Sequence, residues 1–132
     1  MRKWILGFSV EKVCEEGLDL KDIHILRYVI DFMDSGKTMK RNFGREAYHW
    51  ITNKNILENN PLLEINLTKS LRKRMKVLVE KELLDYKLYK NGVSQTFYKK
   101  GRRLELILDQ KQRRKKIEEN LYREIGNEDW ED

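Results

Sequence analysis

The dipeptide Asn91-Gly92 stands between two runs of β-forming residues, and it constrains the fold more than any other feature of the sequence. Residues 86–90 (YKLYK) precede it and residues 94–98 (SQTFY) follow it. A type I′ turn requires a positive φ at both of its central residues, a requirement that Asn-Gly meets well. The sequence therefore predicts an antiparallel β-hairpin with a type I′ turn at Asn91-Gly92.

The segment directly before this hairpin, residues 69–84, has the periodicity of an amphipathic helix. At about 100° per residue its apolar side chains gather on one side and its lysines lie almost opposite. The apolar side holds Leu71, Met75, Leu78 and Val79, and the cationic side holds Lys69, Lys73 and Lys76, with Arg72 and Arg74 on the flanks. One side of this helix is therefore expected to face the core and the other to carry a column of positive charge.

The rest of the chain predicts several further elements. Residues 20–34 are apolar around more than half of a helix, with Asp19 as the N-cap, so this helix is expected to be central to the core. Shorter helices are expected over residues 10–16 and 53–60, a strand over 47–51 and a charged helix over about 110–125. The polar residues 37–46 are expected to form a loop.

Five of the aromatic residues in the predicted strands could either pack the sheet on the core or stack on bases. Trp50, Tyr86 and Phe97 are expected to pack the small sheet on the core, whereas Tyr89 and Tyr98 are expected to point outward. Outward aromatic rings can also stack on single-stranded bases, which is the less favoured interpretation.

The net charge of +6 is concentrated in one part of the chain. Residues 1–65 carry ten basic and ten acidic side chains, residues 66–103 carry twelve and three, and residues 104–132 carry six and nine. The predicted cationic helix and hairpin thus hold the entire excess. A localised basic patch is typical of a nucleic-acid-binding protein, although a solvated lysine-rich surface has the same composition.

The order of helices, small strand, cationic helix and hairpin predicts a winged helix-turn-helix, mainly α with a small antiparallel β wing. We expect one domain over residues 1–103. Residues 104–132 would be a C-terminal helical segment with an acidic tail, serving as a linker or for oligomerisation.

In a winged helix-turn-helix, the second helix of the turn enters the major groove while the wing lies along the backbone. Lysine would act as a point charge on phosphate, and arginine could pair with guanine through two hydrogen bonds. The candidate DNA-binding residues are Lys69, Ser70, Arg72, Lys73, Arg74 and Lys76 on the helix and Lys87, Lys90, Asn91, Gln95 and Lys99 on the hairpin.

No pattern in the sequence indicates an enzyme. The run Ser35-Gly36-Lys37-Thr38 imitates the end of a phosphate-binding loop, but the required preceding glycine is replaced by Asp31, inside a predicted helix. His24, His49 and Cys14 lack the spacing of metal ligands. We therefore expect no catalytic site, no metal, no cofactor and no small-molecule substrate.

The cellular location is predicted from absences in the sequence. No apolar run is long enough to cross a bilayer, the N-terminus lacks a signal-peptide cleavage site, and a single cysteine allows no intrachain disulfide. The expected location is cytoplasmic, without membrane contact.

Several of these runs resemble the N-terminal winged-helix domains of phage replication initiators, or replisome organisers. The runs are ILGF at 5–8, ILRYVIDFMDSGK at 25–37, YHW at 48–50, PLL at 61–63, a Lys/Arg-rich helix and the hairpin, so the resemblance covers about residues 4–99. It implies binding of duplex DNA at origin sites and recruitment of replication proteins through a separate C-terminal region. Carried over by position, the DNA-facing residues are Lys69, Ser70, Arg72, Lys73, Lys76, Lys90 and Asn91.

The chain departs from this pattern after Leu108, where 24 residues leave no room for a recruiting domain. It is therefore expected to be a fragment of an initiator or a stand-alone DNA-binding protein closer to a repressor or accessory factor. A transcriptional regulator and a winged helix that binds proteins are the alternatives. Residues 110–125 could pair two copies into a homodimer.

Overall fold

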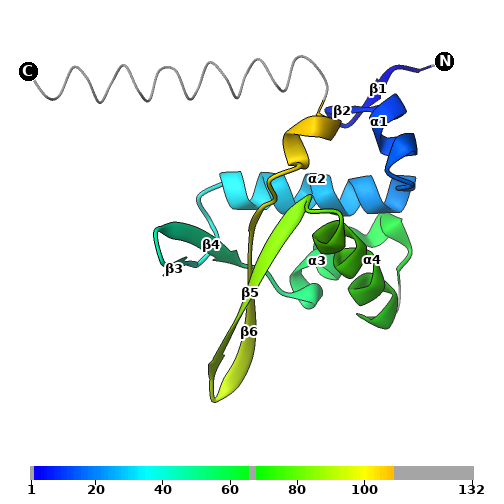
Figure 1. Ribbon diagram of the computed structural model, residues 1–132. Coiled ribbons are helices and arrows are strands. Elements are labelled where there is room, and N and C mark those ends of the chain that lie inside the picture. The colour runs from blue at the N-terminus through cyan, green and yellow to red at the C-terminus, as the bar shows by residue number, and fades with distance from the viewer. Residues whose placement is uncertain (1, 66–67, 109–132) are drawn as a thin grey trace, which may run out of the picture.

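The computed structural model describes residues 2–65 and 68–108 (Figure 1). Helices take up 46% and strands 27% of these residues. The elements, in chain order, are β1 (Trp4–Ile5), β2 (Phe8–Ser9), α1 (Val10–Glu15), α2 (Leu20–Asp34), β3 (Lys40–Phe43), β4 (Glu46–Trp50), α3 (Asn53–Asn59), η1 (Pro61–Leu63), α4 (Thr68–Glu80), β5 (Leu84–Asn91), β6 (Val93–Lys100) and η2 (Leu104–Ile107).

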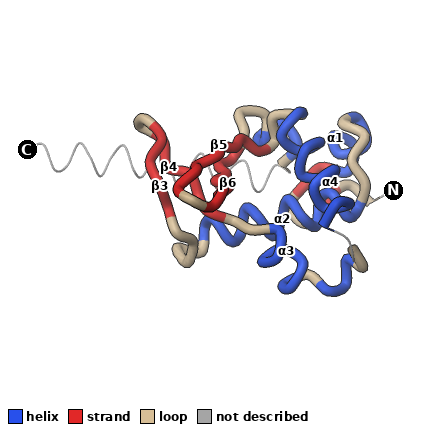
Figure 2. Tube along the Cα trace, turned by 90° about the horizontal axis from the view of Figure 1, so that it is seen from below, coloured by secondary structure: helices blue, strands red, loops and turns tan. Residues whose placement is uncertain are grey.

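The predicted fold class, mainly α with a small β wing in a winged helix-turn-helix, is wrong. The chain is a small α/β protein whose main sheet has four antiparallel strands in the order β3-β4-β6-β5. The strands gather on one side of the molecule and helices α2, α3 and α4 on the other (Figure 2). The predicted hairpin is therefore half of a larger sheet.

Strand β3 is the element that the sequence analysis assigned to a loop. Its residues pair with β4 from Lys40↔His49 to Phe43↔Glu46, and Gly44 provides the positive φ of +66° at the turn. The strand lies at the sheet edge, and Lys40, Arg41 and Asn42 are exposed. An exposed edge strand does not need the alternation of apolar and polar residues that marks a half-buried strand. The sequence of β3 therefore lacks the pattern from which a strand is predicted.

The hairpin of β5 and β6 is confirmed, in a longer form than predicted, with eight paired residues on each strand. Its turn is not of type I′, because Gly92 has a φ of +75° but Asn91 does not have a positive φ. The glycine alone therefore supplies the left-handed residue of this turn.

The core forms between α2, α4 and the base of the sheet. Helix α2 begins at a capping box in which Asp19 and Asp22 each accept a hydrogen bond from the other's backbone N–H. Its buried apolar face packs in one cluster with Leu71, Met75 and Leu78 of α4. The predicted apolar side of the cationic helix is thus confirmed, while Lys69, Lys73 and Lys76 are exposed as expected.

Near the centre of the sheet both faces are buried. Tyr98, paired with His49, belongs to the main core, whereas Phe97, paired with Trp50, makes edge-on contacts with Phe43 and Tyr89. The expectation that Tyr98 points outward is wrong, since adjacent residues of a strand face opposite sides and both sides are covered here. Tyr86, expected in the core, is exposed, because it pairs with Tyr98 from β5, which is an edge strand of the sheet.

The predicted helix 69–84 ends four residues early, at Glu80. Glu82 has a left-handed φ of +60°, and the Gly101 N–H donates to the Leu83 carbonyl at 3.0 Å. A Cβ on Gly101 would lie 2.1 Å from the Glu82 backbone oxygen. The chain can therefore cross the end of α4 only with glycine at position 101.

The C-terminal helix expected over residues 110–125 lies outside the described residues. Within residues 2–65 and 68–108, no helix has both the length and the apolar character that crossing a membrane requires.

Substituting Gly101→Ala should destabilise the fold by roughly 3 kcal/mol, the upper end for overpacking, because the methyl group collides with rigid backbone. The control is Gly44→Ala, where the new methyl group meets no atom within 4 Å and only the left-handed φ opposes it, at about 1 kcal/mol. Urea unfolding followed by circular dichroism measures both. Equal losses in the two variants would contradict the close approach at Gly101.

Candidate nucleic-acid interface

The exposed side of α4 carries four of the predicted contact residues. Lys69, Ser70, Arg72 and Lys73 are exposed, and none of the three cations forms an ion pair with a described residue. Lys76 reaches Glu80 at 3.8 Å, but both side chains are largely exposed, so this pair is weak. The first two turns of α4 thus offer cations that nothing described in the chain neutralises.

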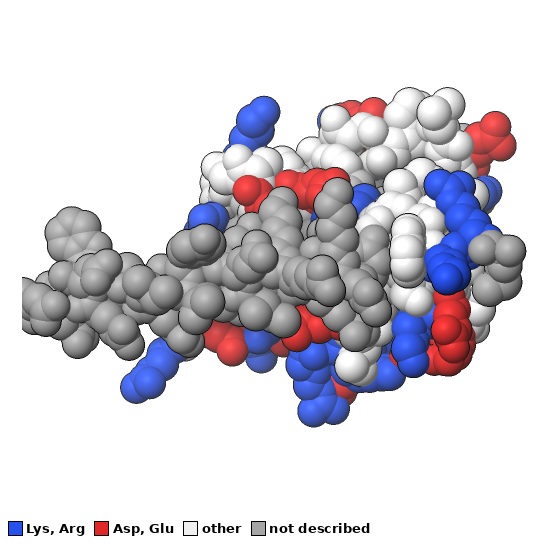
Figure 3. Space-filling view, turned by 90° about the horizontal axis from the view of Figure 1, so that it is seen from above, with Lys and Arg blue, Asp and Glu red and all other residues white. Residues whose placement is uncertain are grey.

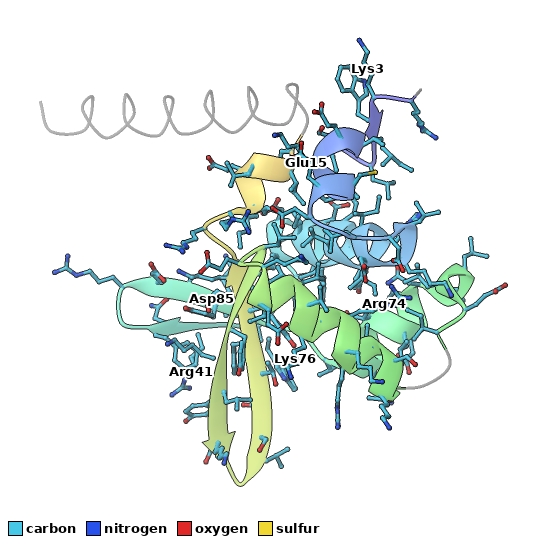
Figure 4. The ribbon with its side chains drawn as sticks, turned by 45° about the vertical axis from the view of Figure 1, so that its right-hand side comes forward. Lys3, Glu15, Arg41, Arg74, Lys76 and Asp85 are labelled. Atoms are coloured by element: carbon cyan, nitrogen blue, oxygen red, sulfur yellow. The ribbon has the colours of Figure 1, made fainter. Side chains whose placement is uncertain are left out.

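Arg74 has a different environment from its neighbours on α4. Its Nη1 donates to Asp19 Oδ1 at 2.7 Å, to Asp19 Oδ2 at 2.8 Å and to Asp22 Oδ1 at 2.8 Å. In Figure 4, Arg74 and Lys76 lie on opposite sides of α4, with Lys76 toward the β5–β6 hairpin. The structure therefore commits Arg74 to holding α4 against the start of α2.

This ion pair changes the titration of its members. The hydrogen bond to Asp19, followed by smaller effects, raises the pKa of Arg74 above its ordinary value. Burial raises the pKa of Asp19. The hydrogen bonds from Arg74 and from the Asp22 amide, together with the charge of Arg74, lower it by more, so the net pKa lies below the ordinary value. The carboxylate of Asp19 thus stays ionised well into acid.

The hairpin residues also divide into two groups. Lys87, Lys90 and Asn91 are exposed and Gln95 is half-buried; Lys90, Asn91 and Gln95 lie on the projecting part of the hairpin, and Lys87 lies at its base, paired with Phe97. Lys99 instead forms ion pairs with Glu46 and Asp85, and the hydrogen bond to Glu46 is the main reason why its pKa is raised. Of the predicted hairpin contacts, Lys99 is the one that described carboxylates neutralise.

All twelve basic residues between positions 66 and 103 divide into those that form an ion pair with a described carboxylate and those that do not. Seven form ion pairs with described carboxylates: Arg74, Lys76, Lys81, Lys99, Lys100, Arg102 and Arg103. The other five are exposed and have no ion pair with a described residue: Lys69, Arg72, Lys73, Lys87 and Lys90. We call these five residues the free cations. On the face seen in Figure 3, by contrast, visible basic and acidic side chains lie next to one another.

A groove of about 810 Å³ separates α4 from the β5–β6 hairpin. Arg72 and Lys76 line it from α4 together with Met75 and Val79. The hairpin contributes Tyr86, Leu88, Val93, Ser94, Thr96 and Tyr98. The groove thus brings α4 and the hairpin together on one surface, with apolar walls, two cations and one carboxylate, Glu80.

Sequence reasoning missed a basic group beside the hairpin. Arg41 of β3 lies over the Tyr89 ring, with the guanidinium carbon 3.5 Å from the ring centre. Lys40 and Arg45 are exposed on the same β3–β4 hairpin. The basic composition of residues 37–46 was the available signal, but only the unexpected pairing of β3 with β4 places Arg41 next to Tyr89.

The described residues contain no group of three or more His, Cys, Asp or Glu side chains arranged to hold a metal ion. His49 Nδ1 is hydrogen-bonded with Thr38 Oγ1 at 2.6 Å, and burial is the main reason why its pKa is lowered. Cys14 and His24 are exposed on separate helices. These three residues therefore do not form a common site.

Comparison of the chain with protein-family models, with curated proteins and with solved structures finds no match. The interpretation of this surface therefore depends on its own residues.

Replacing Arg74 with methionine should destabilise the fold by roughly 1–3 kcal/mol, because Asp22 is only 8% exposed and would lose its charged partner. Arg72→Met is the matched control, and its change should stay within about 0.5 kcal/mol. Urea unfolding at neutral pH measures the difference. Similar losses in both variants would contradict the ion pair.

The loss caused by Arg74→Met should depend on pH. A carboxylate with a lowered folded-state pKa, here Asp19, contributes stability above its ordinary pKa, and this contribution disappears as the pH falls through the folded-state pKa. The difference between the wild type and Arg74→Met should therefore be full at about pH 6 and shrink below about pH 4. A difference that grows in acid would contradict this assignment.

Proposed function

We propose that this chain binds duplex DNA through the exposed side of α4 and the β5–β6 hairpin. The observation that carries the proposal is the distribution of the free cations. All five lie on these two adjacent elements, while the remaining basic residues of the same stretch are paired with described carboxylates. Unneutralised cations on adjoining elements are what phosphate binding requires.

The dimensions of α4 support this proposal. Its 13 residues give a length of about 20 Å, and a major groove about 12 Å wide accepts one α-helix. Lys69, Arg72 and Lys73 lie in the first half of α4, so they would approach the DNA together. Lys90, which shares a face of β5 with the groove residues Tyr86 and Leu88, would then meet a neighbouring phosphate.

The process we propose is replication initiation of the phage type, with binding at origin sites. Its support is the resemblance of residues 4–99 to replication initiators. Regulation of transcription is the alternative, and it would use the same surface, since a binding site alone does not determine the process it serves. Selecting fragments of the source genome that the protein retains separates them. Clustered sites at a replication origin support initiation, and sites at promoters support regulation.

DNA binding should depend steeply on salt. About six phosphate contacts give a slope near −5 for the logarithm of the binding constant against the logarithm of the salt concentration. Fluorescence anisotropy with a long labelled duplex, repeated from about 50 to 200 mM salt, measures this slope. The absence of duplex binding at the lowest salt would overturn the proposal.

The double substitution Lys73→Glu with Lys76→Glu should abolish this binding without unfolding the chain, because both side chains point away from the core. The control, Lys3→Glu with Lys12→Glu, makes the same change in net charge across α2 from the hairpin (Figures 1 and 4). It should bind DNA within about threefold of the wild type, because salt screens the interaction between charges that lie more than about 10 Å apart. Equal losses in both double variants would indicate attraction by net charge alone.

A further inference from the structure

DNA phosphates do not account for the walls of the groove between α4 and the hairpin. Tyr86, Leu88 and Val93 are 44%, 56% and 72% exposed, and all three line the groove. Met75 and Val79 of α4 line it as well. Three apolar side chains exposed beside one another on a small domain indicate a surface that another apolar group covers.

The charges at this groove restrict what can cover it. Arg72 and Lys76 line the groove, and Arg72 is one of the free cations. A purely apolar partner would leave Arg72 without a counterion as water is excluded, and Lys76 with only its weak, largely exposed pair to Glu80, which also lines the groove. A matching partner therefore has an apolar ridge flanked by carboxylates.

The chain itself contains a segment of this chemistry. Residues 117–132 hold seven carboxylates and a single basic residue, Arg123. Ile117, Leu121 and Ile125 follow one another at intervals of four, the spacing that places side chains on one face of a helix. The segment lies outside the described residues, and its sequence alone supplies the complementarity.

We propose that residues 117–132 of one copy bind in the groove between α4 and the β5–β6 hairpin of a second copy. Ile117, Leu121 and Ile125 would cover Tyr86 and Leu88, and the carboxylates would face Arg72 and Lys76.

The connection from Leu108 favours a second copy over the same chain. Leu108 forms a β-bridge with Phe8, and Figure 1 places β2 on the opposite side of α2 from the hairpin tip. Residues 109–116 span at most about 30 Å when fully extended. Passing around α2, itself about 10–12 Å across, and the base of the sheet takes up part of this reach before the segment can enter the groove. Two copies can instead exchange their segments reciprocally, as in a two-fold dimer.

The exchanged segment would also regulate DNA binding, a consequence that rests on the proposed function. Its carboxylates would occupy Arg72 and Lys76, which the proposal assigns to the DNA-facing side. The dimer and the DNA complex would therefore compete for one face.

The experiment measures the molecular mass of the full chain by sedimentation velocity from about 1 to 100 µM, concentrations that bracket micromolar affinity. The variants are Leu88→Glu in the groove and Leu121→Glu in the segment. Leu62→Glu is the control, because Leu62 is 95% exposed and does not line the groove. We expect a dimer for the wild type and for Leu62→Glu, and a dissociation constant at least tenfold higher for each of the other two variants.

Mixing the two weakened variants tests the pairing directly. The Leu88→Glu chain keeps an intact segment and the Leu121→Glu chain keeps an intact groove, so the mixture should form a heterodimer that neither forms alone. A wild-type monomer, a dimer unaffected by both substitutions or a mixture without heterodimer overturns the proposal. Circular dichroism and melting temperatures close to the wild type show that Leu88→Glu is folded.

DNA binding by Leu121→Glu separates the two proposals. If both hold, this variant binds duplex DNA at least threefold more tightly than the wild type, because the competing segment is lost. If the dimer responds to the substitutions but no variant binds DNA, the proposed function fails and the interface stands. If DNA binds but the dimer ignores the substitutions, the interface fails and the proposed function stands.

Discussion

Two neighbouring pairings, His49 with Tyr98 and Trp50 with Phe97, join the β3–β4 and β5–β6 hairpins into one sheet. They place Tyr98 against the helices and Phe97 against the aromatic rings on the other face, so both faces help to fix the base of β5 and β6. Residues 93–96 of β6 have no partner on β4, and this half of the hairpin projects beyond the sheet (Figure 1). The groove beside α4 follows both halves of the hairpin, since Tyr86 and Tyr98 line it at the base and Leu88 and Val93 line it on the projecting half.

Ion pairing decides which part of the basic stretch is available to a partner. Carboxylates from the electrically neutral first half of the chain, among them Glu16, Asp19 and Asp34, neutralise cations near the base of α4 and of the sheet. None of the described carboxylates reaches the free cations of α4 and the hairpin. The excess of positive charge is spread over 38 residues in the sequence, but in the folded chain only the five free cations of α4 and the hairpin within this stretch lack a described carboxylate partner.

Local patterns predicted the elements whose signals lie within one segment. The N-cap of α2 at Asp19, the apolar stripe of α4 and the position of the hairpin turn, though not its type, were all visible in this way. Strand β3 could not be predicted, because its register is set by β4 and its exposed side chains carry no periodicity. Arg74 was assigned to DNA for a similar reason, since its partner Asp19 lies 55 positions away and a flanking arginine looks the same in sequence whether paired or free. Periodicity predicted on which side of α4 a residue lies. The partner of Arg74 follows only from the packing of α4 on α2.

The two occupants proposed for the α4–hairpin face depend on salt in different ways. Binding to DNA weakens steeply as salt rises, because the gain from released counterions falls with their concentration outside. Docking of an acidic amphipathic segment loses only its electrostatic part to screening, while the contact with Tyr86 and Leu88 does not depend on charge. Rising ionic strength therefore shifts the balance from the DNA complex toward the exchanged dimer. The apolar walls of the groove contribute little to binding phosphate but hold the exchanged segment. They are therefore the reason why ionic strength would shift the balance between the DNA complex and the dimer.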